Sequence, residues 1–412
     1  MAQEIILGIG GVRMLGQAGY NIRKYHINEG HSALLTLELF NQLKRKENGE
    51  FDFEVVRGLC VFTTHTPVAA GHAKFSYDLM TQVLGEIIPF DYLRMLAGED
   101  RLNMTLLALN LSGHVNGVAK KHGEVSQAMF PGYPIDSITN GVHALSWSCE
   151  SFRKLYDRHI PAWRNDPLSL RYALNIPLEE IGEAHMEAKR AIIEYVNRHS
   201  PHAFEPDVFT IGFARRATAY KRPDFILADT GRLADLTRTA GKLQIVFGGK
   251  AHPKDQTGKD LIKRIVNLSD KIGDDIRIVY LENYDMKLGS LITSGVDLWL
   301  NTPLKPNEAS GTSGMKAALN GVPSLSVLDG WWIEGCIEGF TGWCIGSASM
   351  EQTPSEVDET QELYNKLEYL ILPTYEKREE WGRIMQHCIA INGSFFNTHR
   401  MVLQYVLNAY FT

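Results

Sequence analysis

The sequence predicts an α/β protein whose second half forms a parallel, doubly wound sheet. From residue 208 to residue 328, apolar runs of four to six residues alternate with segments of helical periodicity, as they do in βαβ units. The chain has 412 residues, more than one hydrophobic core usually supports, so two domains are expected. Hydrophobic residues at 44% and charged residues at 22% are typical of a globular protein.

The elements of the first half follow from local patterns. Residues 4–11 combine an apolar run with glycines, which predicts a strand followed by a tight turn. Residues 55–63 are rich in Val, Leu and Phe and predict a buried strand. The other elements predicted before residue 205 are a strand at 23–27, helices at 30–43, 102–122 and 178–198, and a surface connection at 161–177.

The second half alternates more regularly. Each predicted strand is a short apolar run, and each predicted helix repeats its apolar positions at three- and four-residue spacing. Strands are predicted at 208–213, 243–247, 276–281, 297–300 and 324–328, and helices at 224–238, 256–272, 286–294, 312–319, 361–371, 379–391 and 398–410. Ligands of such sheets bind beyond the carboxyl ends of the strands, so the loops that follow the strands are the candidate site.

Charge and cysteine content argue against several classes of function. A net charge of −6 provides no general basic surface, so no nucleic-acid partner is expected. Five cysteines without a C-x-x-C pair favour a reducing, cytoplasmic location over a disulfide framework. No apolar run reaches the roughly 18 residues of a membrane span, so no membrane partner is expected. No convincing ligand spacing predicts a metal site.

Residues 307–316 form the most informative motif. The run Asn-Glu-Ala-Ser-Gly-Thr-Ser-Gly-Met-Lys places Glu308 and Lys316 on either side of a Gly/Ser turn, between a predicted strand and a predicted helix. Glycines there let backbone N–H groups approach an anion at a helix N-terminus. Cationic surroundings and desolvation would lower the pKa of Lys316 and make its amine a better nucleophile. Pyridoxal phosphate, a phosphate-bearing aldehyde, fits both halves of the motif, whereas an isolated Gly/Ser loop would only open an ordinary helix.

A basic loop follows the strand predicted at 208–213. Arg215, Arg216, Lys221 and Arg222 place four cations within eight residues, which would repel one another unless an anion neutralised them. The alternative is a solvated basic loop. The position of the loop after a strand favours an anion site.

Together with residues 320–321 and 328–330, residues 308–316 resemble the cofactor-lysine signature of the α-glucan (glycogen/maltodextrin) phosphorylases. The resemblance implies two Rossmann-like doubly wound domains of the GT-B-type glycosyltransferase architecture. It implies that pyridoxal 5'-phosphate is held by Lys316 as a Schiff base. It also implies a retaining reaction in glycogen/maltodextrin breakdown, in which inorganic phosphate takes a terminal glucosyl unit from an α-1,4-glucan to give glucose 1-phosphate.

The resemblance assigns roles to individual residues. The residues implied to be catalytic are Arg216, Lys221 and His65. Those implied to bind the cofactor are Lys316, Arg215, Tyr284, Gly311 and Thr312. Those implied to bind substrate are Asn140, Glu308, Ser310, Gly311 and His31. Structural histidines and a plain Asn-Gly turn remain the alternatives for His31, His65 and Asn140.

The sequence also departs from the family pattern. Asp285 follows Tyr284 where better-known members carry an arginine, which removes one possible phosphate contact. Thr218 and Ala219 replace bulkier polar residues in the basic loop. Lys250, in the glycine loop at residues 248–253, is as consistent with a structural turn as with a functional one. These departures suggest a divergent branch.

The resemblance begins near the middle of the family's first domain, so we expect a first domain that is incomplete. The predicted organisation is residues 1–140 as the C-terminal part of the glucan-binding domain, 141–204 as interdomain connection and helices, 205–396 as the second, cofactor-binding domain, and 397–412 as a C-terminal helix packing back on the first domain. We expect an unpaired strand at residues 5–7 and little or no phosphorolytic activity from the chain alone. A missing N-terminal half or a homo-oligomer are the expected protein partners.

Two other functions stay open at this point. Sugar-nucleotide-dependent GT-B glycosyltransferases often carry two glutamates separated by seven residues. Here Glu308 is followed at that spacing by Lys316, so an amine stands where a ribose-binding carboxylate would be. The other alternative is a catalytically incomplete binding fragment of a phosphorylase.

Overall fold

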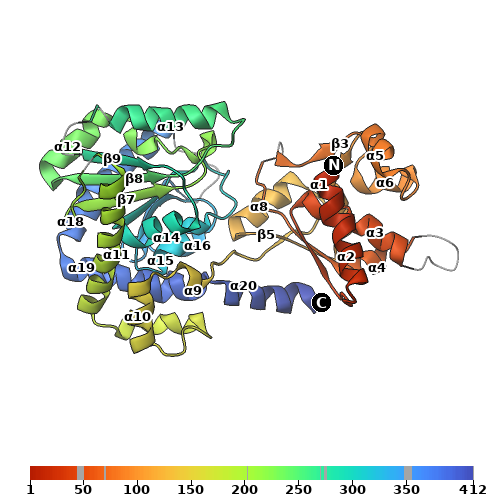
Figure 1. Ribbon diagram of the computed structural model, residues 1–412, viewed down its shortest axis with the longest axis horizontal. Helices are drawn as coiled ribbons and strands as arrows, with labels where there is room; N and C mark the ends of the chain where they lie inside the picture. Colours follow the sequence, from red (N-terminus) through yellow and green to blue (C-terminus); the bar gives the residue numbers. More distant parts are fainter. Residues whose placement is uncertain are drawn as a thin grey trace. The chain divides into compact units, whose positions relative to one another are not determined.

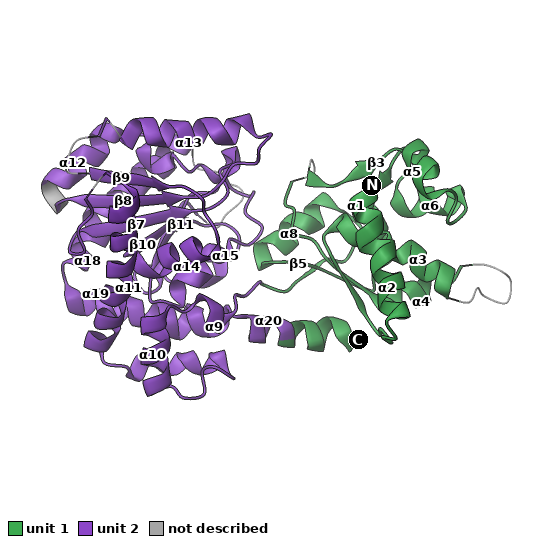
Figure 2. Cartoon of the chain, viewed as in Figure 1, with its two compact units in different colours: residues 1–139, 403–412 green, residues 140–402 purple. Residues whose placement is uncertain are grey.

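The computed structural model describes residues 1–43, 51–68, 71–201, 203–269, 271–272, 276–347 and 355–411. These residues form two compact units, residues 1–139 with 403–412 and residues 140–402 (Figure 2). Each unit contains a parallel β-sheet and helices (Figure 1). The predicted mixed α/β fold with parallel sheet is confirmed. Among the described residues, no helix is both long enough and apolar enough to cross a bilayer.

The first unit is built on a four-stranded parallel sheet in the order β1-β2-β5-β6. Its strands are β1 (Tyr25–Asn28), β2 (Cys60–Thr63), β5 (His114–Gly117) and β6 (Asp136–Ser137), with a separate antiparallel pair of β3 (Lys74–Phe75) and β4 (Leu102–Asn103). Its helices are α1 (Ala2–Ile5), α2 (Gly11–Gln17), α3 (Leu35–Gln42), α4 (Phe53–Leu59), α5 (Tyr77–Leu84), α6 (Phe90–Ala97), α7 (Met104–Asn110) and α8 (Lys120–Met129), with a π-helical turn at Ile6–Gly10 and a 3-10 turn at Gly30–Ser32.

The strand predicted at residues 4–11 is wrong, because the chain is helical throughout α1, the π turn and α2. Ile9 and Val12 are buried three residues apart, as one face of a helix requires. Gly8 lies where this helix meets α3, and a Cβ there would stand 2.8 Å from the backbone nitrogen of Leu35. The glycine therefore permits close packing rather than a tight turn. The unpaired edge strand expected at the opening does not exist.

Three further predictions in the first half need correction. The strand predicted at 55–63 combines α4 with the fully buried β2. The helix predicted at 102–122 contains β4, α7, β5 and the start of α8. A short apolar run does not distinguish a buried strand from a buried helix, which accounts for the first error. In the second, apolar spacing interpreted as one helix covers two strands, one whole helix and the start of another. The surface connection predicted at 161–177 contains a 3-10 helix, Pro167–Asn175, and buries Trp163 and Leu170 completely.

The second unit is built on a six-stranded, entirely parallel sheet in the order β12-β11-β10-β7-β8-β9. Its strands are β7 (Phe209–Ala214), β8 (Leu243–Gly248), β9 (Ile276–Leu281), β10 (Leu298–Asn301), β11 (Ser324–Val327) and β12 (Gly342–Ile345). The five strands predicted in this half are all present with ends shifted by at most one residue, whereas β12 was not predicted.

The helices of the second unit are α9 (Ala144–Trp147), α10 (Glu150–His159), α11 (Leu178–His199), α12 (Thr230–Ala240), α13 (Gln256–Ser269), α14 (Met286–Gly295), α15 (Thr312–Ala318), α16 (Trp332–Gly335), α17 (Glu356–Lys366), α18 (Leu372–Tyr375), α19 (Arg378–His387) and α20 (Thr398–Tyr405), the last of which continues into the first unit. Short 3-10 turns occupy Ala219–Lys221 and Phe225–Leu227, and π-helical turns occupy Leu367–Ile371, Cys388–Gly393 and Val406–Tyr410.

Both faces of this sheet are covered by helices (Figure 1). In β8, Ile245 and Phe247 join one hydrophobic cluster while the intervening Val246 joins another. The second cluster is completed by α11 and α14, with Ile192 and Ile292 fully buried. Successive strand residues point to opposite faces, so a strand buried on both faces is a continuous apolar run. That pattern is why the strands of this half were predictable.

The C-terminal segment contributes to the first unit. The hydroxyl of Tyr410 lies 2.7 Å from Nδ1 of His26 in β1. The hydroxyl of Tyr405 lies 3.1 Å from Oγ1 of Thr63 and accepts a hydrogen bond from Nδ2 of Asn116, also at 3.1 Å. Residues 403–412 therefore belong to the first unit although they are far from it in sequence.

Candidate active site

The strand order brings two of the predicted site segments together at the carboxyl ends of neighbouring strands in the second sheet. The chain winds from β7 to β8 and β9 on one side, and β10 then pairs with the other side of β7. The loops after β7 and β10 leave the sheet where the strand order reverses, which is where doubly wound sheets bind ligands. These loops carry residues 215–222 and 302–311.

Glu308 is the centre of a charged cluster formed by these two loops. Nζ of Lys221 lies 2.8 Å from Oε1 and 2.7 Å from Oε2 of Glu308. Nη2 of Arg215 donates to Oε2 at 2.6 Å, and its Nη1 donates to Oδ1 of Asn301 at 2.5 Å. Glu308 and Lys221 are both buried. The structure thus brings three of the predicted site residues together.

Burial and neighbouring charges set the protonation of this cluster. Burial and Arg215 lower the pKa of Lys221 to about 8, although Glu308 opposes the shift. Burial alone would raise the pKa of Glu308, but Arg215 and Lys221 outweigh it and hold that pKa below its ordinary value. Near neutral pH, two cations therefore share one carboxylate, and one positive charge is left in excess.

The other two cations of the basic loop have different positions. Arg216 is exposed, and its guanidinium makes no hydrogen bond or ion pair with a described residue, so it adds a further free positive charge. Arg222 is buried with a positive φ of 44°. Its Nε and Nη2 donate to the carbonyls of Thr302 and Pro303 at 2.9 and 3.0 Å, and it forms an ion pair with Glu359. Arg222 therefore ties the two loops together.

Asp329, a residue that the sequence prediction missed, holds the backbone of Glu308. Its Oδ2 accepts from the N–H of Glu308 and its Oδ1 from the N–H of Gly330, both at 2.8 Å. Gly330 has a φ of 55°, and a Cβ there would lie 2.5 Å from the carbonyl oxygen of Ser310. Burial raises the pKa of Asp329 to about 6. The Leu-Asp-Gly sequence at the end of a predicted strand was the signal that could have identified this position.

Lys316 lies in the last turn of α15 rather than at its start. Its Nζ lies 3.6 Å from the ring centroid of Trp147, and burial lowers its pKa. Asn320 fixes the backbone that carries this ring, because its Nδ2 donates to the carbonyl of Trp147 at 2.9 Å and its Oδ1 accepts from the N–H of Cys149 at 2.8 Å. A lysine with a lowered pKa is a competent amine nucleophile. Trp147 was not predicted, because no local pattern connects it to the motif.

The Gly/Ser turn before α15 has the features of an anion-binding cradle. Gly311 caps the helix with a φ of 86°, directly before Thr312, and a Cβ on Gly314 would lie 2.8 Å from the ring of Trp331. Among the described residues, Oγ of Ser310 and Nε of Arg215 are buried without a hydrogen-bond partner. Buried polar atoms are normally paired, so these two atoms fit an oxygen-rich group bound beside the turn.

Tyr284 and Asp285 follow β9. The ring of Tyr284 packs against Gly248 and Gly289, and burial raises the pKa of its hydroxyl. Asp285 caps α14, since its Oδ1 accepts from the N–H of Leu288 at 2.8 Å. Helix capping therefore explains the acidic residue at this position.

The glycine loop after β8 supports the backbone of Arg215. Gly249 has a φ of 145°, and a Cβ there would lie 2.0 Å from the carbonyl oxygen of Arg215. The N–H of Arg215 in turn donates to the carbonyl of Gly248 at 3.0 Å. Lys250 is exposed, so the structural turn is the better-supported interpretation of this loop.

The predicted histidines belong to the first unit. Nε2 of His65 lies 2.6 Å from Oδ1 of Asn28, and its backbone N–H donates to Oε2 of Glu29 at 2.8 Å. Glu29 also accepts from the hydroxyl of Thr66 at 2.7 Å and has a positive φ of 58°. Glu29 thus organises this loop, a role that the sequence did not indicate. His31 is exposed in the short 3-10 turn that follows.

Asn140 opens the second unit and is half-buried. Its carbonyl oxygen accepts from Nη2 of Arg400 at 2.9 Å. A Cβ on Gly141 would lie 2.2 Å from the carbonyl oxygen of Asn397, so glycine is needed for close approach of the two segments. The Asn-Gly pair is therefore a fixed contact point rather than a free turn.

Comparison with known proteins agrees with the signature seen in the sequence. The chain is 40% identical to the maltodextrin phosphorylase of Thermococcus litoralis, over 98% of this chain and 53% of that protein. It is 35% identical to the glycogen phosphorylase of Aquifex aeolicus, over 100% of this chain and 66% of that protein. It is also 35% identical to the glycogen phosphorylase of Mycobacterium bovis, over 99% of this chain and 54% of that protein.

The chain thus spans between about half and two thirds of the length of these relatives. The family model of the carbohydrate phosphorylases matches residues 90–410, and the chain therefore belongs to the carbohydrate phosphorylase family.

Proposed function

We propose that the chain acts as part of a GT-B-type glucan phosphorylase, which transfers terminal α-1,4-linked glucosyl units to inorganic phosphate and yields glucose 1-phosphate with retention. The observation that carries the proposal is the convergence of Arg215 and Lys221 on Glu308 at the switch point of the second sheet. The surplus positive charge of this cluster suits a phosphate. The names of the relatives agree with this reaction, and none of the three suggests a sugar-nucleotide donor.

Pyridoxal 5'-phosphate fits the segment around α15. Lys316 would attach it through its desolvated amine, and the unpaired donors of Ser310 and Arg215 would face its oxygens. Gly311 and Thr312 would contribute backbone N–H groups, and Tyr284 would lie in the same set of post-strand loops. When bound, the cofactor supplies a phosphate whose second pKa of about 6 allows proton exchange near neutral pH.

The cations of the basic loop would hold the substrate phosphate. Lys221 is mostly protonated at neutral pH and lies at hydrogen-bond distance from Glu308, while Arg216 is free to reach a ligand. A phosphate held there can pass its proton to the departing glycosidic oxygen, and its negative oxygens stabilise the cationic sugar-like transition state. The charges of Lys221 and Arg216 are thus proposed to be catalytic.

The sugar contacts are proposed for Glu308, Asn140, His31 and His65. A carboxylate has about four lone-pair sites, and three are used by Lys221 and Arg215. The remaining site on Oε1 of Glu308 can accept a sugar hydroxyl. His65 has its imidazole oriented by Asn28, which favours a positioned contact over a free side chain.

The cofactor assignment is tested by reconstitution with pyridoxal phosphate, borohydride reduction and peptide mass mapping. The label should fall on the peptide that contains Lys316, disappear in Lys316→Ala and persist in Lys250→Ala, which removes an exposed lysine of a neighbouring loop. A label on another lysine of the folded chain would defeat the assignment.

Glucose 1-phosphate release from maltodextrin and phosphate then tests the reaction. Activity that depends on Lys316 supports the proposed function. Because the chain alone is expected to have little or no activity, the assay is repeated with the chain extended by the N-terminal half of a phosphorylase's first domain. Cofactor binding at Lys316 without phosphorolysis by the extended chain, at any tested glucan or phosphate concentration, would instead favour a binding fragment of a phosphorylase.

A further inference from the structure

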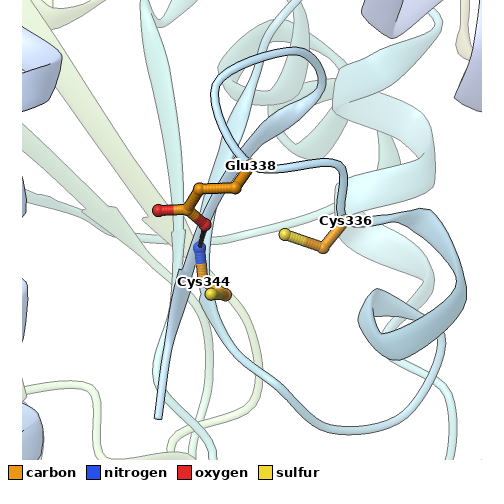
Figure 3. A group of neighbouring side chains, drawn as sticks. All are labelled: Cys336, Glu338 and Cys344. Carbon is orange, nitrogen blue, oxygen red and sulfur yellow. Dashed lines mark hydrogen bonds between the residues drawn. The ribbon is translucent and has the colours of Figure 1, made fainter. Parts of the chain in front are cut away.

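Cys336, Glu338 and Cys344 form a cluster of metal-ligand atoms that the proposed reaction does not use (Figure 3). Cys336 directly follows α16, Cys344 lies on the edge strand β12, and Glu338 lies on the turn between them. The two Sγ atoms and one carboxylate oxygen all lie within 4.8 Å of one another. The Cys-x-Glu-x₅-Cys spacing matches no common zinc pattern, so the sequence alone predicted no metal site.

The turn that carries these side chains is fixed by its own hydrogen bonds. The carbonyl of Ile337 accepts from the N–H groups of Phe340 and Thr341, both at 2.9 Å. The N–H of Gly339 donates to the carbonyl of Gly342 at 2.9 Å, and both glycines have positive φ angles, of 75° and 143°. The fold therefore brings residues 336 and 344 face to face before any ligand binds. A preformed site loses less conformational freedom on binding.

The donor set favours a thiophilic divalent ion. Thiolates select zinc over magnesium and calcium, which prefer oxygen ligands. With Zn–S near 2.3 Å and Zn–O near 2.0–2.2 Å, donors around a tetrahedral zinc stand roughly 3.5–3.8 Å apart. The observed cluster needs only small side-chain rotations to reach that spacing. Glu338 is exposed, which leaves a face open to a water ligand.

A positive charge already sits against this cluster. Nζ of Lys366 lies 2.7 Å from Oε1 of Glu338 and 3.5 Å from Sγ of Cys344. It also lies 3.1 Å from Oε1 of Glu362. The Lys366 ammonium can therefore keep its ion pair with Glu362 when a metal ion binds the two thiolates. Two thiolates and the carboxylate of Glu338 carry three negative charges, and a divalent ion with Lys366 balances them.

We propose that Cys336, Glu338 and Cys344 bind one zinc ion, with a water molecule as fourth ligand. The ion would join the end of α16 to the edge strand β12 and so stabilise the second unit. Binding releases the two thiol protons to solvent and involves no electron transfer.

The test is a zinc titration of the full-length, reduced chain in competition with a chromophoric chelator. We expect one zinc per chain. Cys336→Ser and Cys344→Ser should each weaken binding at least about tenfold, and Glu338→Gln about tenfold. The matched control is Cys149→Ser, which alters a half-buried cysteine outside the cluster and should leave the zinc affinity unchanged.

Cobalt substitution gives a second readout. The wild-type chain should show a thiolate-to-cobalt charge-transfer band that is lost in either cysteine variant. Glu338 is exposed, so Glu338→Gln keeps the test informative even if a cysteine variant fails to fold. Equal zinc binding by the wild type and the Cys336→Ser/Cys344→Ser double variant would overturn the proposal, because zinc would then bind elsewhere, for example on histidines. A Cys336–Cys344 disulfide in the isolated chain, with no zinc binding after reduction, would also overturn it.

Discussion

Replacing Glu308 should destabilise the second unit strongly, because it leaves buried cations without their anion. In Glu308→Gln, Lys221 and Arg215 lose a carboxylate that lies 2.6 to 2.8 Å from their nitrogen atoms. Removing one partner of a buried ion pair costs about 3–5 kcal/mol. Lys221→Met should lower the free energy of unfolding by less, about 2–3 kcal/mol. Glu308 still forms its ion pair with Arg215 in this variant, and no lysine charge has to be desolvated.

The double variant separates this interaction from other effects. If the two charges stabilise each other, the two substitutions are not additive. The double variant Glu308→Gln/Lys221→Met should then have a free energy of unfolding about 2–3 kcal/mol higher than the sum of the two single effects predicts. All seven tryptophans of the chain lie between residues 147 and 381, so tryptophan fluorescence during urea unfolding reports on the second unit alone.

A matched control cycle uses Glu379 and Arg383, an exposed pair on α19 with side chains 73% and 62% accessible. Its coupling should be about 0.5 kcal/mol or less. Additive losses at Glu308 and Lys221, within about 0.5 kcal/mol, would refute the buried ion pair.

Three further outcomes are expected. The coupling between Glu308 and Lys221 should shrink as the pH rises through about 8, where Lys221 loses its proton, and double-mutant cycles at pH 7 and pH 9.5 measure this. Asp329 has a folded pKa raised to about 6, so its contribution to stability is complete below the unfolded pKa of 3.8 and is lost as the pH rises through 6. The stability of the wild type relative to Asp329→Asn should therefore fall by about 1 kcal/mol between pH 5 and pH 7, and a pH-independent difference would contradict the assignment. In an intact homologous phosphorylase, Arg216→Ala should impair phosphate use by about ten- to a hundredfold with glucan binding unchanged, whereas Lys250→Ala should change neither; initial rates at varied phosphate and glucan check both.

The sequence predicted the strands of the second unit well because those strands are buried on both faces. Strand β8, for example, is entirely buried, with Leu243, Ile245 and Phe247 in one hydrophobic cluster and Val246 in the other. The prediction for the opening segment, a strand at residues 4–11, was wrong for the opposite reason. Ile6 and Leu7 are 73% and 57% exposed there, so apolar content did not report which face was buried. The presence of Gly8 predicted a turn, because glycine is common in turns. In the structure Gly8 instead allows close packing against the backbone of Ser32 and Leu35.

The candidate site was predictable where its residues share one loop. Glu308 and Lys316 belong to one contiguous motif, and Lys221 follows a clear strand. The partners that set their chemistry come from elsewhere in the chain. Trp147 contacts Lys316 directly and its backbone is held by Asn320, and Asp329 contacts Glu308 from the loop after the next strand. Such contacts depend on sheet order, which a single sequence does not contain.

The charge count of the Glu308 cluster is the physical basis of the proposed phosphate site. Arg215 and Lys221 outnumber Glu308 by one charge, and the exposed Arg216 brings the surplus to two. A phosphate dianion would neutralise that surplus, while a neutral sugar alone would leave it uncompensated. In the proposed site Glu308 would have a double role: it would keep Lys221 and Arg215 fixed while no phosphate is bound, and its remaining acceptor site on Oε1 would take a sugar hydroxyl. This combination favours a site that binds phosphate and sugar side by side, as the proposed phosphorolysis requires.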